Sequence, residues 1–322
     1  MKRLTLTAGL AILAFAIAPA VSRAGTVTEG FVATPNGTGG YTFQTVISPG
    51  DTAFTQLLGI NNSSTIAGYF GDGAVVPNNG FTLVLPNTFT PENFPGSVQT
   101  QVVGINNTGE TVGFWIDGAG VNHGFTDISG TFKSVDNPNT TTVTQFLGVN
   151  DSGEVAGYWT DAAGNFHPFT WVPGTFTDLS VPGQVSAQAT DVNNAGDVTG
   201  FNMTSGTTSD GFLDIGGVFT KLDFPGSVFT QALGLNNSGQ VVGFYTDSAG
   251  MNHGFLYTIS SASYVSISDP FASGPGGTII NGTNDKGQLV GFFTTTTPEP
   301  ASLLLIGTGL LALTRLFRRR RA

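Results

Sequence analysis

The 322-residue chain contains no cysteine, and between residues 25 and 297 it has only three basic residues, Lys133, Lys221 and Lys286. Without cysteine the chain cannot form disulfide bonds, a zinc ribbon or a thiol nucleophile. Residues 25–297 also carry 20 acidic residues, which gives them a formal charge of −17. Because a nucleic-acid-binding surface needs clustered basic residues, nucleic acid is not expected as a partner.

Glycine and phenylalanine are abundant instead, with 46 and 26 residues. Turn-forming residues recur about every ten positions, and no 3.6-residue periodicity runs through the central part of the chain. Short apolar segments between frequent turns are typical of β-strands. The composition therefore predicts an all-β body.

The first 24 residues have the features of an export signal. Lys2 and Arg3 precede an apolar stretch over residues 6–17, and small-residue cleavage sites end at Ala20 and Ala24. This order predicts a Sec-type signal peptide, a short helix that signal peptidase removes. An uncleaved membrane anchor is the alternative.

The last 25 residues contain three successive features. The triplet Pro298-Glu299-Pro300 is followed by an apolar run over residues 301–314 and then by basic residues. Counted through Phe317, the apolar stretch is about 17 residues long, at the lower limit for a spanning helix, so a short transmembrane helix is predicted. The charges beyond it would hold the terminus in the cytoplasm while the body lies outside. The basic residues are Arg315, Arg318, Arg319, Arg320 and Arg321.

This tail resembles the PEP-CTERM sorting signal of Gram-negative, exopolysaccharide-producing bacteria. The resemblance implies recognition by an exosortase-like enzyme that cuts at or near the triplet. It also implies transient anchoring in the inner membrane, followed by display on the cell surface or release. An ordinary tail anchor is the alternative.

One string recurs six times between the two ends. It reads GINNSSTIAGYF from Gly59 and returns after 45, 44, 43, 43 and 48 residues. A glycine follows the first asparagine of each copy seven residues later. The six asparagines are Asn61, Asn106, Asn150, Asn193, Asn236 and Asn284. A fixed period of this length is typical of repeat architectures.

Each unit contains four short β signals, which is the size of a propeller blade. The segment from residue 25 begins with a third-strand pattern, Gly30-Phe31, whereas the last repeat ends after its second strand, near Phe293. These complementary halves predict one shared blade, which removes the open sheet edges. Residues 25–297 are therefore predicted to form a six-bladed β-propeller closed by its N- and C-terminal strands.

The repeats also resemble the HAF family of extracellular repeats. The likeness lies in the Gly-hydrophobic-Asn-Asn-x-Gly-x-hydrophobic-x-Gly core and in the trailing His-Gly-Phe. Glu29, Asn79 and Asp210 replace the histidine in some units. The resemblance implies a surface location and no established chemistry.

Phenylalanines recur at the same position of the third strand and again in the fourth. Stacked blades would bury these rings, at about 1.5–3 kcal/mol each. Stability would then arise between neighbouring blades, because no single unit has a core of its own. The third-strand residues are Phe31, Phe81, Phe125, Phe169, Phe212 and Phe255.

Two sets of residues could suggest metal sites. His123, His167 and His253 occupy one repeat position, so the ring should keep them apart, and a structural or surface role is predicted. The turns at Asp117, Asp161 and Asp247 lack a full calcium-loop pattern and are predicted to be hairpin turns. Neither a metal nor a cofactor is expected.

A third set is polar and lies five residues before the repeat asparagine. If the first strand is innermost, these side chains would lie near one mouth of the central channel and could bind a sugar or another small polar ligand. Alternatively, each glutamine bonds the adjacent blade and helps to close the ring. The set comprises Gln56, Gln101, Gln145, Gln188 and Gln231.

No catalytic motif accompanies these features, since the chain has neither cysteine nor a Gly-x-Ser-x-Gly elbow. The sequence predicts an exported, non-enzymatic surface or matrix protein with a structural or interaction role. A carbohydrate-binding propeller, with exopolysaccharide as the ligand, is the second hypothesis. A polysaccharide lyase or hydrolase is the third.

Overall fold

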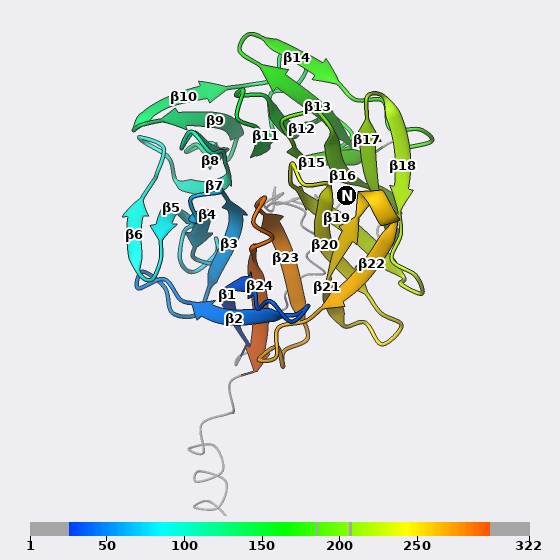
Figure 1. Cartoon of the computed structure of the whole chain (residues 1–322). Coiled ribbons are helices and arrows are strands. Elements are labelled where there is room, and N and C mark those ends of the chain that lie inside the picture. The colour runs from blue at the N-terminus through cyan, green and yellow to red at the C-terminus, as the bar shows by residue number, and fades with distance from the viewer. Residues whose placement is uncertain (1–25, 185, 206–207, 297–322) are drawn as a thin grey trace, which may run out of the picture.

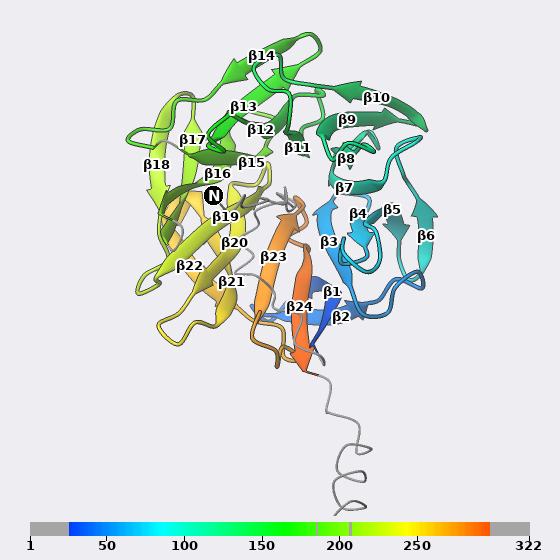
Figure 2. The ribbon, with the colours of Figure 1, turned by 180° about the vertical axis from the view of Figure 1, so that it is seen from behind.

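A computed structural model describes residues 26–184, 186–205 and 208–296 of the chain. They form six four-stranded antiparallel sheets around a central axis (Figures 1 and 2). The predicted six-bladed β-propeller is thus confirmed. The predicted signal peptide of residues 1–24 and the transmembrane helix and arginines of residues 298–322 lie outside the described residues.

We number the blades I–VI along the chain. Blade I comprises β3 (Thr55–Ile60), β4 (Thr65–Phe70), β5 (Asn79–Val84) and β6 (Thr88–Pro91). Blade II comprises β7 (Gln99–Ile105), β8 (Thr111–Ile116), β9 (Asn122–Ile128) and β10 (Thr131–Val135). Blade III comprises β11 (Thr144–Val149), β12 (Val155–Thr160), β13 (Phe166–Val172) and β14 (Thr175–Asp178). Blade IV comprises β15 (Ala187–Val192), β16 (Val198–Ser205), β17 (Thr208–Ile215) and β18 (Val218–Leu222). Blade V comprises β19 (Phe229–Leu235), β20 (Gln240–Thr246), β21 (Asn252–Thr258) and β22 (Ser263–Ile267). A 3₁₀ turn, η1 (Ile259–Ser261), connects β21 to β22.

Blade VI is built from both ends of the described chain. Its strands are β23 (Thr278–Thr283), β24 (Leu289–Thr296), β1 (Thr26–Pro35) and β2 (Tyr41–Val46). The two chain ends pair antiparallel from Thr26↔Thr296 to Ala33↔Leu289, and the blue and orange strands lie side by side in Figure 1. The predicted closure by a shared blade is confirmed.

The repeated glycine of the second strand has a packing reason. A Cβ atom at Gly113 would meet the backbone oxygen of Gln101 on the neighbouring strand, and Phe125 lies 3.0 Å away on the other side. The same arrangement holds in all six blades, where the glycine faces the first-strand carbonyl oxygen. Only glycine leaves room for this close approach of two backbones.

Apolar side chains fill each interface between blades, which we call a seam and name by its two blades. In seam VI/I, for example, Val32 and Val290 of blade VI pack with Leu57 and Ile66 of blade I. Every blade also contributes an aromatic pair between its third and fourth strands, such as Phe81 and Phe89 at 4.9 Å between ring centroids. All six third-strand phenylalanines are buried, as predicted.

Candidate functional site

The first strand of each blade is innermost and carries a β-bulge near its end. In blade I, the pairing of β3 with β4 shifts between Leu57 and Gly59, so Leu58 is the extra residue. Leu58, Val103, Leu147 and Leu233 occupy this position in four blades and join one central apolar cluster. A bulge adds one unpaired residue to a strand and redirects its side chain. The six bulges therefore fill the channel rather than leave a pore.

A cavity of about 80 Å³ remains at the mouth of the channel. The bulge residues and the six Asn turns of the first hairpins line it. This volume has room for several water molecules. The mouth is thus the place where the channel meets solvent.

The repeated asparagines form an inner ring around this mouth. In blade II, the Oδ1 atom of Asn106 accepts the backbone N–H groups of Thr108 and Glu110, both at 3.0 Å. Its Nδ2 atom donates to the backbone oxygen of Asn150 in the next blade, at 2.9 Å. The amide therefore stabilises its own turn and the neighbouring seam at once. The local sequence predicts the bonds of the side chain within its own turn, but not the bond to the next blade.

The turn bonds to Oδ1 recur in all six units. The bond to the next blade is made by five of the six asparagines. The exception is Asn193 of blade IV, whose Nδ2 atom donates to its own Asp197 at 2.9 Å. One seam of the inner ring therefore differs from the others.

The residue after each inner asparagine belongs to an outer ring, which is continuous. Each backbone N–H donates to the side-chain oxygen at the same position of the next blade, at 2.7–2.9 Å. The six members are Asn62, Asn107, Asp151, Asn194, Asn237 and Asp285. This closed circle of hydrogen bonds fixes the positions of the six residues relative to one another.

The two carboxylates of the outer ring lie three blades apart, in blades III and VI. Asp151 accepts the side-chain amides of both neighbours, Asn107 and Asn194, and Asp285 does the same with Asn62 and Asn237. Partial burial acts to raise the pKa of Asp151, but the hydrogen bonds from Asn107 and Asn194 outweigh it and lower that pKa. The ring therefore stabilises the charged form of Asp151.

Blade IV departs from the repeat at the mouth. Asp191 occupies the position where the other five units have glycine. Its carboxylate accepts the backbone N–H groups of Val192 and of Leu235 in blade V, both at 2.9 Å. Burial nevertheless raises the pKa of Asp191 to about 7. The sequence signal for this residue is that the repeated string begins with aspartate in this unit (DVNN) and with glycine in the other five.

The five glutamines predicted to lie near a mouth are buried in the first strands of their blades. All are 0–6% exposed, and none lines the cavity. Gln101 and Gln145 donate to Asn78 and Asn122 of the preceding blades, at 2.9 and 3.1 Å. For these two glutamines, the bonds agree with the alternative that each glutamine bonds the adjacent blade. Their binding of a ligand stays a prediction, although burial removes their amides from direct contact with solvent.

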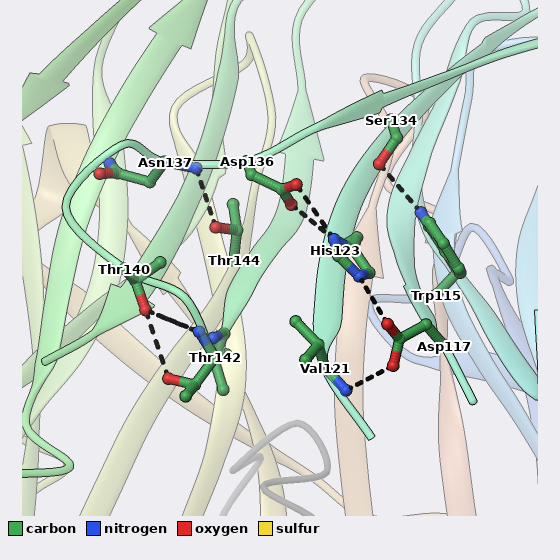
Figure 3. Close-up of polar contacts among 11 residues, drawn as sticks. Trp115, Asp117, Val121, His123, Ser134, Asp136, Asn137, Thr140, Thr142 and Thr144 are labelled. Atoms are coloured by element: carbon green, nitrogen blue, oxygen red, sulfur yellow. Dashed lines mark hydrogen bonds and ion pairs between the residues drawn. The ribbon is translucent and has the colours of Figure 1, made fainter. Parts of the chain in front are cut away.

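The three histidines lie in blades II, III and V, at the ends opposite the Asn turns. Each pairs with an aspartate of its own hairpin turn; His167 and His253 do so at 3.1 Å. Figure 3 shows His123 between Asp117 and Asp136 and beside Trp115, whose ring centroid lies 4.4 Å away. The backbone N–H of Val121 and the contact with His123 lower the pKa of Asp117.

These histidines thus contact aspartates of their own blades and do not form one cluster. The turn aspartates also accept backbone N–H groups of their own loops, as Asp117 does from Ala119 and Val121. Across residues 26–184, 186–205 and 208–296, no group of three or more His, Asp or Glu residues is arranged to hold a metal ion. The aspartate turns are hairpin turns, as predicted.

Seam I/II is the second irregular place. Val46, Ile66 and Leu83 pack together in seam VI/I, whereas Glu92, Thr111 and Asp127 occupy the equivalent positions in seam I/II. Thr111 donates its hydroxyl to Glu92. Burial and the nearby charge of Asp127 raise the pKa of Glu92 to about 7, while the Thr111 bond acts to lower it. This trio was not predicted, although Glu92 stands at a fourth-strand position where the other five blades have an apolar residue.

An open groove of about 520 Å³ lies between blades V and VI. The β1–β2 hairpin contributes Tyr41 to its lining, and the β23–β24 turn contributes Asp285 and Lys286. Gln240 and Thr258 of blade V line the other side. The groove therefore combines an aromatic ring with hydrogen-bonding groups of both kinds.

Comparison with known families identifies the C-terminal tail. Residues 296–321 match the model of the PEP-CTERM protein-sorting motif. This motif implies export and a cell-surface or extracellular fate in Gram-negative bacteria, and it is consistent with processing by an exosortase-like enzyme. A search of curated protein sequences found no significant match. In the part of the chain that the structure describes, no helix is long and apolar enough to span a membrane.

Solved structures share the fold at low identity. A protein assigned as TolB from Agrobacterium tumefaciens has a TM-score of 0.62 and 10% identity, covering 85% of this chain and 99% of that chain. TolB from Acinetobacter baumannii has a TM-score of 0.56 and 12% identity, and the match covers 74% of this chain and 62% of that chain. AofleA from Arthrobotrys oligospora has a TM-score of 0.53 and 10% identity, and the match covers 82% of this chain and 85% of that chain. At these identities the likeness shows the fold alone.

Proposed function

We propose that the mature protein is a non-enzymatic, surface-displayed propeller that binds an extracellular partner through the face of its two Asx rings. The observation that carries the proposal is the continuous outer ring, in which every backbone N–H is bonded to the next blade. A rigid array of this kind loses little conformational entropy on binding. The PEP-CTERM motif supports display at the cell surface.

The alternative is binding of exopolysaccharide, and the groove between blades V and VI favours it. Tyr41 offers an aromatic ring, and Lys286, Gln240 and Asp285 offer hydrogen-bond donors and acceptors. Saccharide sites commonly combine an apolar surface with a few polar groups that fix orientation.

A glycan array, followed by calorimetry with purified host exopolysaccharide, separates the two candidates. Saturable saccharide binding that Tyr41→Ala and Lys286→Ala abolish would favour the groove. His167→Ala, at the opposite end of a blade, should leave such binding unchanged. Binding of protein partners without saccharide binding would favour the ring face, and release of saccharide products would instead indicate an enzyme.

The sorting step has its own test. Cell fractions should contain a chain whose intact mass lacks the arginine cluster of residues 318–321. Replacing Pro298 and Glu299 by alanine should keep the uncut chain in the inner-membrane fraction. A mature surface protein that retains Arg318–Arg321 would contradict exosortase processing.

A further inference from the structure

Three polar residues interrupt the sixfold pattern of the channel, and all three line the mouth cavity. Thr190 and Asn281 occupy bulge positions where four other blades have leucine or valine, and Asp191 replaces a glycine. Thr190 and Asp191 come from blade IV and Asn281 from blade VI, on the two sides of blade V. The exceptions therefore gather on one side of the axis.

Asn281 supplies an oxygen atom without a partner. Its Nδ2 atom donates to the backbone oxygen of Leu57 at 2.8 Å. Its Oδ1 atom has no hydrogen-bond partner, although Asn281 is only 4% exposed. Leaving a buried acceptor unsatisfied is costly, and four blades avoid it with an apolar residue. A donor or a cation in the cavity would satisfy this oxygen.

The other two residues also line the cavity, and their side chains carry acceptor atoms. Thr190 donates its only hydroxyl hydrogen to backbone oxygens, those of Thr199 and Ala232 at 3.2 and 3.1 Å, which leaves its lone pairs available. The carboxylate of Asp191 accepts two backbone N–H groups. Since an ionised carboxylate has about four lone-pair sites, it retains capacity for another ligand.

We propose that the mouth cavity binds a hard monovalent cation, of the sodium or potassium class, through Asp191, Thr190 and Asn281. Oxygen donors of this kind select hard cations over transition metals. One carboxylate balances a single positive charge, whereas calcium sites usually recruit several carboxylates. The proposal does not depend on what the outer surface of the propeller binds.

The cation would complete the seam that the inner ring leaves weak. Asp191 reaches from blade IV to Leu235 of blade V, and Asn193 of the same blade is the inner asparagine that makes no bond to the next blade. A bound cation would attract oxygens from blades IV and VI, on both sides of blade V. We therefore expect cation binding to stabilise the closed ring.

The test is calorimetric melting of the whole mature protein at constant ionic strength in sodium, potassium, calcium or tetramethylammonium chloride. Sodium or potassium should raise the melting temperature by about 3 °C or more over tetramethylammonium, since a ligand of the folded state stabilises it. Asp191→Gly and Asn281→Leu should abolish this difference. Both restore the residue type of other blades and should fold.

Asp178→Asn is the matched control, because it removes the same charge from an exposed position on β14 and should retain the full cation effect. Equal melting temperatures in all four salts would overturn the proposal. An effect that persists in both cavity variants would also overturn it, and stabilisation by calcium alone would reject a monovalent ion.

Discussion

Seams VI/I and I/II solve the same packing problem with different chemistry. At equivalent positions, seam VI/I has Val46, Ile66 and Leu83, and seam I/II has Glu92, Thr111 and Asp127. The backbone pairing of the blades is the same in both. The repeat therefore fixes where blades meet, whereas the side chains decide how strongly each seam holds and whether it responds to pH.

The largest expected effect comes from breaking seam VI/I and blade VI together. Deleting residues 25–50 removes β1 and β2, and with them Phe31, Val32 and Val46 from two apolar clusters. Several buried side chains at about 1.5–3 kcal/mol each are lost, so the melting temperature should fall by roughly 10 °C or more. A thermal melt unchanged by the deletion would refute the shared blade.

A smaller effect is expected where two innermost strands touch. Gly148→Ala would place a Cβ atom 2.6 Å from the Cα atom of Asp191 and 2.9 Å from the backbone oxygen of Thr190. Overpacking of this kind costs about 1–3 kcal/mol. Gly118→Ala is the control, because no atom lies within 4 Å of its Cβ position and its φ is not positive. Urea unfolding of both variants measures the difference; equal free energies of unfolding would contradict it.

The pH dependence sharpens the comparison of the two seams. The pKa of Glu92 is about 7 in the folded state and about 4.5 when unfolded, chiefly because of burial. The folded state therefore loses stability as the pH rises from about 4.5 through 7, and the loss is complete above 7. Glu92→Gln keeps an acceptor for Thr111 and cannot ionise. The free energy of unfolding of this variant should exceed that of the wild type by about 1–2 kcal/mol at pH 8, allowing for solvent screening, and should match it near pH 4.

Val46→Glu is the reciprocal variant in seam VI/I. It introduces a carboxyl group among Ile66 and Leu83, so it should destabilise the protein more at pH 8 than at pH 4. Chemical denaturation at the two pH values tests both variants. If Glu92→Gln shifted stability equally at both pH values, Glu92 would not be the source of the pH dependence.

The smallest effect concerns the inner ring. Asn106→Asp keeps the turn acceptor but removes the Nδ2 donor to Asn150, whereas Asn193 has no bond to the next blade to lose. Both sites have an acidic residue four positions later, Glu110 and Asp197, so their repulsion is matched. Asn106→Asp should therefore cost about 1 kcal/mol more than Asn193→Asp in the free energy of unfolding. Equal costs would show that the inter-blade bond contributes nothing.

Much of the fold was predictable because the repeat period, the turn residues and the two incomplete ends are all local in sequence. The candidate site was less predictable. Gln101 was expected near a mouth, but its burial and its bond to Asn78 of blade I depend on how two blades pack, and no local signal indicates them. No local signal indicated that the Nδ2 atom of Asn106 would bond the next blade, because that contact joins residues 44 positions apart.

The sequence by itself determined the number of blades, their closure and the sorting tail, since periodicity and a terminal motif are properties of the order of residues. Only the tertiary structure decided that the channel is filled, that the asparagines form rings, and that the side chains of Asp191 and Glu92 become partly buried. The physical reason is that burial and hydrogen bonding depend on which blades become neighbours, and the chain alone does not contain those distances.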